Sequence, residues 1–144
     1  IDVFPPAQQE QVRMQLANTL QGIVTQTLLP TADHAGRVAC LEILLPDDAV
    51  RNLIRQGKVE QIYSVMQTST SRGMQTMEQS LADLVLRHVI TPELAFARSS
   101  RPDQLHGLLE RSGMTNFTAA AADNGSTAGD ETPAESGLRL AQEV

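Results

Sequence analysis

The chain has 144 residues, of which 41% are hydrophobic, 19% charged and 3% aromatic, and its net charge is −6. This length fits one domain or part of a larger one. No apolar run approaches the roughly 18 residues of a transmembrane helix, since Glu42 interrupts even the apolar stretch Val38–Leu45. The acidic balance, with no basic face, argues against a nucleic-acid partner.

Cys40 is the only cysteine. A single thiol excludes an internal disulfide framework and a cysteine-based zinc site, and it fits a reducing cytosol. The first residue is Ile1, and nothing after it resembles a signal peptide. We therefore expect a chain that is mature, processed or truncated.

Residues 113–144 differ in composition from the rest of the chain. Ala, Thr, Gly, Ser, Asp and Glu dominate there, and five acidic residues accompany the single Arg139. Ordering about 30 residues costs roughly 1–2 kcal/mol each. The few large apolar side chains recover only about 2–3 kcal/mol each on burial. The composition predicts a disordered acidic tail.

Residues 1–45 predict a helix followed by a β-hairpin. Pro5 and Pro6 are suited to a first helical turn, and apolar residues then recur at helical spacing, which predicts one long amphipathic helix over about residues 6–26. After a turn at residues 33–36, we expect Thr27–Leu29 to pair with Val38–Leu44. The second strand is apolar on both faces, which predicts cover on both sides by partners that this segment need not contain.

Five mostly short helices are expected after Pro46. Asp47 or Asp48 would cap the first, which ends at Gly57, and a second spans about residues 59–67. Residues 68–73 have the composition of a loop. The third begins near Met74, and Thr91 and Ser100, each shortly before a proline, mark the starts of the last two.

The usual catalytic motifs are missing from these residues. The one Gly-Lys pair, Gly57-Lys58, is followed by Val59 and does not make a phosphate-binding loop. The histidines are widely spaced, and the pair Asp47-Asp48 is better explained as a helix cap than as a catalytic or metal-binding pair. No serine has a histidine at a spacing that suggests a nucleophilic triad.

One helix is unusual. In residues 49–56, Val50, Leu53 and Ile54 would share a buried stripe, while Arg51 and Arg55 lie four apart on another face with Asn52 beside them. Two guanidinium groups in register could bind carboxylates or backbone carbonyls of a partner. The alternative is an ordinary solvated polar face.

The octet AVRNLIRQ (Ala49–Gln56) closely resembles AIRNLIRE, the signature helix of PilT, the twitching-motility retraction ATPase family of type IV pili. IDVFPPAQQEQVRMQLANTLQGIVTQTLLP, GRVACLEILL, QIYSVMQT and GMQTMEQSLADLV also resemble that family, in order and at its spacing. The similarity runs from Ile1 to about Leu109.

The resemblance implies an α/β fold. Residues 1–45 would form the last part of a RecA-like P-loop ATPase core, residues 46–112 a helical C-terminal region, and residues 113–144 the tail. The parent would bind ATP and Mg²⁺ through residues upstream of this segment, so the segment alone should be inactive. It would act as a homo-hexamer at the cytoplasmic face of the inner membrane, at the pilus base, against the platform protein.

In such proteins the octet is needed for pilus retraction. The resemblance therefore assigns a motor or partner-coupling role to the whole motif, with Arg51→Ala and Arg55→Ala expected to impair motility while leaving folding nearly intact. The motif comprises Ala49, Val50, Arg51, Asn52, Leu53, Ile54, Arg55 and Gln56. Val50 stands for Ile, Gln56 replaces Glu and removes a charge, and residues 68–72 stand where relatives often carry glycines.

Two alternatives accompany this hypothesis. A pilus assembly or type II secretion ATPase usually carries a four-cysteine zinc module, against which the single Cys40 argues. A stand-alone, non-catalytic helical interaction module is the alternative of another class. A reading frame that continues upstream of Ile1 into a P-loop would eliminate it.

Overall fold

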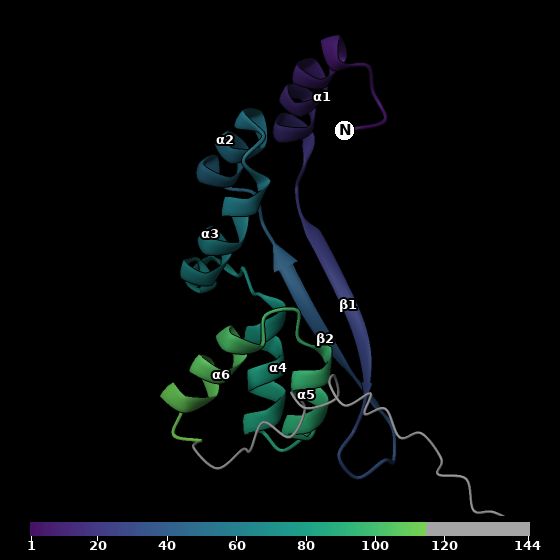
Figure 1. Cartoon of the computed structure of the whole chain (residues 1–144), viewed down its shortest axis with the longest axis vertical. Helices are drawn as coiled ribbons and strands as arrows, with labels where there is room; N and C mark the ends of the chain where they lie inside the picture. Colours follow the sequence, from purple (N-terminus) through teal and green to yellow (C-terminus); the bar gives the residue numbers. More distant parts are fainter. Residues whose placement is uncertain (115–144) are drawn as a thin grey trace, which may run out of the picture.

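The computed structural model describes residues 1–114, in which a two-stranded hairpin carries helices at both ends (Figure 1). Helices α1 and α2 lie side by side at one end, and α4, α5 and α6 gather at the other. The elements are α1 (Pro6–Thr19), β1 (Ile23–Pro30), β2 (Arg37–Leu44), α2 (Asp48–Gln56), α3 (Ile62–Thr68), α4 (Met77–Leu86), α5 (Pro92–Arg98) and α6 (Pro102–Arg111). Two 3₁₀ turns, η1 (Val59–Gln61) and η2 (Thr70–Arg72), precede α3 and follow it.

The hairpin is antiparallel, and its register runs from Ile23 opposite Leu44 to Pro30 opposite Arg37. The predicted hairpin is confirmed, but the predicted helix over residues 6–26 was too long. Helix α1 ends at Thr19, and the chain is extended from Leu20 into β1. Gly22 disfavours a helix, and the β-branched residues that follow it are better suited to a strand. Helical spacing alone did not separate the two, because Ile23, Val24 and Leu28 continue the apolar pattern of α1.

The hairpin is covered on one side and open on the other within residues 1–114. Leu29 and Cys40 on one face are buried against α4, whereas Val24, which is 64% exposed, and Leu28, which is 51% exposed, lie on the opposite face. The expected cover on both faces is therefore not present among the described residues. The exposed side leaves an apolar surface beside the strands.

The described residues form two hydrophobic cores that share strand β2. The first joins Leu29 and Cys40 of the hairpin to α4, α5 and α6. The second joins Leu44 at the far end of β2 to α1, α2, α3 and Met74. Since Cys40 belongs to one core and Leu44 to the other, β2 fixes the distance between the two helical groups.

The five helices predicted after the hairpin are present, with two local differences. Met74 and Gln75 precede α4, because the Gln75 backbone pairs with Ile43 at 2.8 and 2.9 Å and Thr76 makes a capping box with Gln79. Ser100 does not cap α6: Arg101 occupies the N-cap position, and the Ser100 hydroxyl donates to Glu78. The segment predicted to be a loop contains η2, and Met66 and Met74 on either side of it are core residues.

The predicted disordered acidic tail, beyond Met114, lies outside the described residues. Within residues 1–114, no helix has both the length and the apolar character needed to cross a membrane.

Candidate functional site

Helix α2, which carries the octet motif, has well-defined ends. The Asp47 carboxylate accepts a hydrogen bond from the Val50 amide at 3.0 Å, so it caps the N-terminus as predicted. Gly57 ends the helix in the left-handed conformation, with φ of 71°, which a glycine adopts without steric cost. The motif therefore occupies one short helix with both termini specified by sequence.

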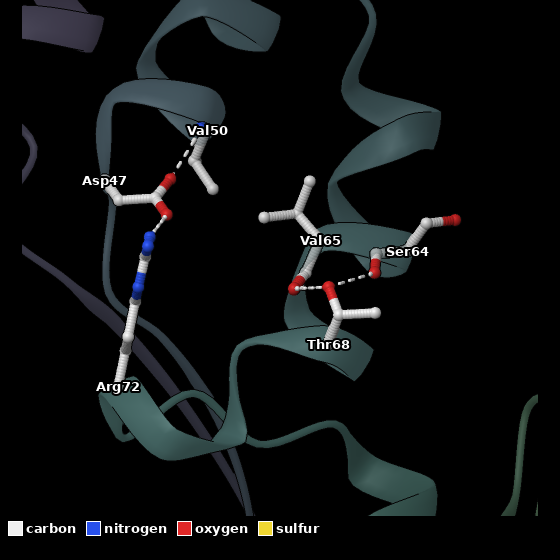
Figure 2. A network of polar contacts seen from close by, with 6 residues as sticks. All are labelled: Asp47, Val50, Ser64, Val65, Thr68 and Arg72. Carbon is white, nitrogen blue, oxygen red and sulfur yellow. Dashed lines mark hydrogen bonds and ion pairs between the residues drawn. The ribbon is translucent and has the colours of Figure 1, made fainter.

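The cap is also an ion pair. Figure 2 shows the Asp47 carboxylate between the Val50 amide and the guanidinium of Arg72, which lies 2.5 Å away in η2. The hydrogen bond from the Val50 amide, followed by the Arg72 side chain, lowers the pKa of Asp47 below its usual 3.8. This carboxylate joins the start of α2 to the turn that precedes α4.

The octet divides into three faces. Val50 and Ile54 form the buried face, which packs in the core with Leu44 and Met66. The predicted buried stripe is confirmed for these two residues, whereas Leu53 is only partly buried. A position that is 0% exposed, as Val50 is, accommodates the smaller Val where the related motif has Ile.

The second face contacts α1. The Arg51 guanidinium donates to the backbone carbonyl of Ala17, and the Arg55 guanidinium donates to Oδ1 of Asn18 at 3.1 Å. Ala17 lies in the last turn of α1, where carbonyls have no helical amide donor, and it is 0% exposed. The spacing of the two arginines left two alternatives open, binding of carbonyls or carboxylates of a partner and an ordinary solvated polar face. In this structure they bind oxygen atoms of their own chain.

A third arginine completes this contact from the opposite side. The Arg13 side chain of α1 lies over the C-cap of α2, where a Cβ on Gly57 would stand 3.5 Å from its Nε. Arginine at the end of a helix interacts favourably with its partial negative charge. Helices α1 and α2 are thus held together near both ends of α2.

The third face lines an open groove between α2 and α3, formed by Ala49, Asn52, Leu53, Gln61, Ser64 and Val65. Neither wall carries a charge, so the groove offers small apolar surfaces beside two side-chain amides. The Thr68 hydroxyl closes α3 on the carbonyls of Val65 and Ser64, as Figure 2 shows. Gln56, at the end of the octet, is exposed.

The Gly57-Lys58 pair does not fit a nucleotide phosphate. Its two amides donate to Ile54 and Leu53 at 3.1 and 2.9 Å, so both are used in ending α2. A phosphate site needs free amides at the start of a helix instead. Neither backbone amide of this pair is available to bind a phosphate.

The three histidines lie in exposed turns or on a helix surface. His34 and His88 have positive φ values of 55° in exposed turns, and His106 lies 3.4 Å from Glu110 on the surface of α6. Among residues 1–114, no three His, Cys, Asp or Glu side chains come together in a way that could hold a metal ion.

Sequence reasoning missed a buried carboxylate. Glu78 is 1% exposed, and its oxygens accept bonds from Tyr63 at 2.9 Å, Ser99 at 3.2 Å and Ser100 at 3.3 Å. The guanidinium of Arg101 lies 3.9 Å from the centre of the Tyr63 ring. Burial, and then the Glu78 carboxylate, raise the pKa of Tyr63 to about 12. The available signal was the position of Glu78 four residues after Met74 and three before Leu81, inside the apolar stripe.

Comparison with known proteins finds relatives of this chain among the proteins of type IV pili. The chain is 48% identical over 105 residues to the twitching motility protein of Neisseria gonorrhoeae, and 42% identical over 103 residues to the type IV pilus retraction ATPase PilT of Pseudomonas aeruginosa. These matches include 73% and 72% of this chain, but only 28% and 30% of the relatives.

A solved structure agrees with these relatives. The pilus retraction motor PilT with bound ADP matches 74% of this chain with a TM-score of 0.65 and 46% identity, over 29% of its own length. The chain belongs to the PilT family. Its α/β fold is that of a PilT segment, although no family model matches the sequence. The chain spans about three tenths of the length of the curated PilT relatives.

We predict that Arg51→Ala and Arg55→Ala destabilise this PilT-family chain by different amounts. Removing the Arg51 guanidinium leaves a buried carbonyl at Ala17 without a donor, which costs about 1–3 kcal/mol. Removing Arg55 frees an exposed amide that water can solvate, which costs about 0.5 kcal/mol. The free energies of unfolding in urea would measure both. The sequence-based expectation of nearly intact folding then holds for Arg55 alone. Equal losses would contradict this assignment.

A second prediction concerns acid unfolding. Because folding lowers the pKa of Asp47, its contribution to stability is complete well above 3.8 and is lost as the pH falls through the lowered value. Asp47→Asn keeps an oxygen acceptor for the Val50 amide but removes the charge. The difference in unfolding free energy between wild type and variant should therefore shrink as the pH is lowered below 3.8.

Arg72→Gln serves as the matched control for this titration. This substitution removes the ion pair and leaves the cap. The double variant with Asp47→Asn should therefore lose little more free energy of unfolding than Asp47→Asn alone. A difference that stays constant down to acid pH would show that the Asp47 charge does not stabilise the fold.

Proposed function

We propose that the parent protein is an ATP-hydrolysing motor that retracts type IV pili. The observation that carries this proposal is the 48% identity to a twitching motility protein, together with the match to the retraction motor PilT. The octet adds to it, because AVRNLIRQ forms a single capped helix with distinct buried, α1-facing and groove-facing sides.

In this proposal residues 1–45 complete a RecA-like ATPase core and residues 46–112 form the helical C-terminal region. The exposed apolar side chains of Val24 and Leu28, on the open face of the hairpin, support the division. An apolar surface beside two strands is what remains when the rest of a sheet and its helices lie elsewhere in the parent. The tail, residues 113–144, has no assigned role.

ATP and Mg²⁺ would be bound by parts of the parent outside this chain. The solved relative holds ADP, whereas the amides of Gly57-Lys58 are used within α2. Catalysis of phosphoryl transfer depends on positioned donors and a metal around the transferred group. The sequence contains no Gly-x-x-x-x-Gly-Lys-Ser/Thr loop, and in this proposal the chain alone does not hydrolyse ATP.

The assembly in this proposal is a homo-hexamer at the cytoplasmic face of the inner membrane, at the base of the pilus. The octet, Ala49–Gln56, couples the motor to retraction, and the platform protein of the pilus is the partner. The neutral groove lined by Asn52 and Leu53 gives the motif an accessible side in the described part of the chain.

Two assays test the proposal. The purified 144-residue chain should show no magnesium-dependent ATP hydrolysis, and the full-length parent should hydrolyse ATP and restore twitching to a strain that lacks its retraction ATPase. Hydrolysis by the chain alone, or a full-length parent that restores pilus assembly but not retraction, would contradict the proposal.

A further inference from the structure

The oxygen atoms bound by Arg51 and Arg55 belong to one short stretch of α1. Ala17 and Asn18 are adjacent, and they lie in the last turn of that helix. Arg51 and Arg55 are one helical turn apart on α2, so both side chains project from the same face. We call these four residues, Ala17, Asn18, Arg51 and Arg55, the α1–α2 contact.

The hairpin connects the two sides of this contact at one end. Helix α1 leads through residues 20–22 into Ile23, and β2 leads from Leu44 through residues 45–47 into α2. Ile23 and Leu44 are register partners, so both links leave the ladder at the same place. A Cβ at Gly22 would lie 3.4 Å from the Leu44 carbonyl oxygen, which shows how closely the two links pass.

A helix joined to a strand by three residues can still rotate about that link. The Asp47–Arg72 pair and the burial of Val50 and Ile54 attach α2 to η2 and to the core. The directional tie between α2 and α1 is the α1–α2 contact, in which Arg51 is half-buried and donates to a 0% exposed residue. Since a guanidinium has a rigid planar array of donors, it orients the carbonyl as well as attracting it. The contact therefore sets the angle of α2 relative to α1 and the hairpin (Figure 1).

The geometry points to Arg51, Arg55 and Asn18 as positioning residues that hold the octet helix in register with the ATPase core. The inference rests on the proposed function and assigns different tasks within the octet. Arg51 and Arg55 act through α1, so that movement of the α1–hairpin unit is transmitted to α2. The groove face, with Ala49, Asn52 and Leu53, is the side left for contacts outside this unit.

A double-mutant cycle in the full-length parent tests this inference. The variants are Asn18→Ala, Arg55→Ala and the double substitution, and the two readouts are ATP hydrolysis and the rate of pilus retraction. If Arg55 acts through Asn18, each single substitution lowers retraction per ATP hydrolysed by about twofold, the fold-change that corresponds to the loss of one exposed hydrogen bond. The double variant is then no worse than either single one.

Conservative variants and a matched control exclude a general loss of folding. Asn18→Asp keeps the acceptor oxygen for Arg55 and should retain retraction. Gln15→Ala changes another exposed polar side chain of α1 and should leave the ratio of retraction to hydrolysis unchanged. Arg51→Gln retains an N–H donor for the Ala17 carbonyl and should lose less retraction than Arg51→Ala.

Each other outcome overturns the inference. Additive effects of Asn18→Ala and Arg55→Ala, or an effect of Arg55→Ala alone, would mean that Arg55 binds a group outside this chain. Parallel loss of hydrolysis, retraction and thermal stability would mean that the contact only maintains the fold. A wild-type parent that neither hydrolyses ATP nor supports retraction would instead refute the proposed function, so the two failures are distinguishable.

Discussion

The hydrogen bond from Arg51 to the carbonyl of Ala17 is the interaction on which the arrangement of the octet depends. It satisfies an acceptor at a helix end that has no helical partner and no access to water. Without it, α2 would be held at this end by the Asp47–Arg72 pair, which binds η2 and not α1, and by the apolar contacts of Val50 and Ile54, which fix distance better than orientation. The motif is therefore connected to α1 by directional bonds and to the core by non-directional burial.

Strand β2 extends this arrangement through the molecule. It contributes Leu44 to the core beneath α1 and α2, and Cys40 to the core formed with α4, α5 and α6. The Asp47–Arg72 pair and the Ile43–Gln75 bridge then connect the two halves a second time. A change at the hairpin would reach both helical groups, because β2 belongs to both cores.

Local signals in the sequence predicted much of the fold and less of the site. Asp47, Thr91 and Gly57 specify helix ends through their own side chains or backbone freedom, so neighbouring residues were enough. The end of α1 was misplaced because Ile23 and Val24 satisfy a helical spacing while their partners, Leu44 and Ile43, lie about twenty residues away. Pairing across that distance is decided by tertiary contacts.

The targets of the arginines were not predictable for the same reason. Spacing showed that Arg51 and Arg55 share a face, and their chemistry indicated oxygen acceptors. Nothing in the sequence around Ala17 and Asn18 indicates that their oxygen atoms are those acceptors. Glu78 was similar: its place in an apolar stripe was visible, whereas its partners come from two other segments, Tyr63 from α3 and Ser99 and Ser100 from the link between α5 and α6. The family resemblance, carried by several motifs in order, added what local patterns could not.

The most direct test of this account is hydrogen exchange at the backbone amides of α1 and α2 in the full-length parent, with and without Arg51→Ala. If the bond to Ala17 holds the two helices together, exchange should become faster in the last turn of α1 and in α2, and remain unchanged in α4 and α6. Unchanged exchange in α1 and α2 would contradict the central role assigned to this contact.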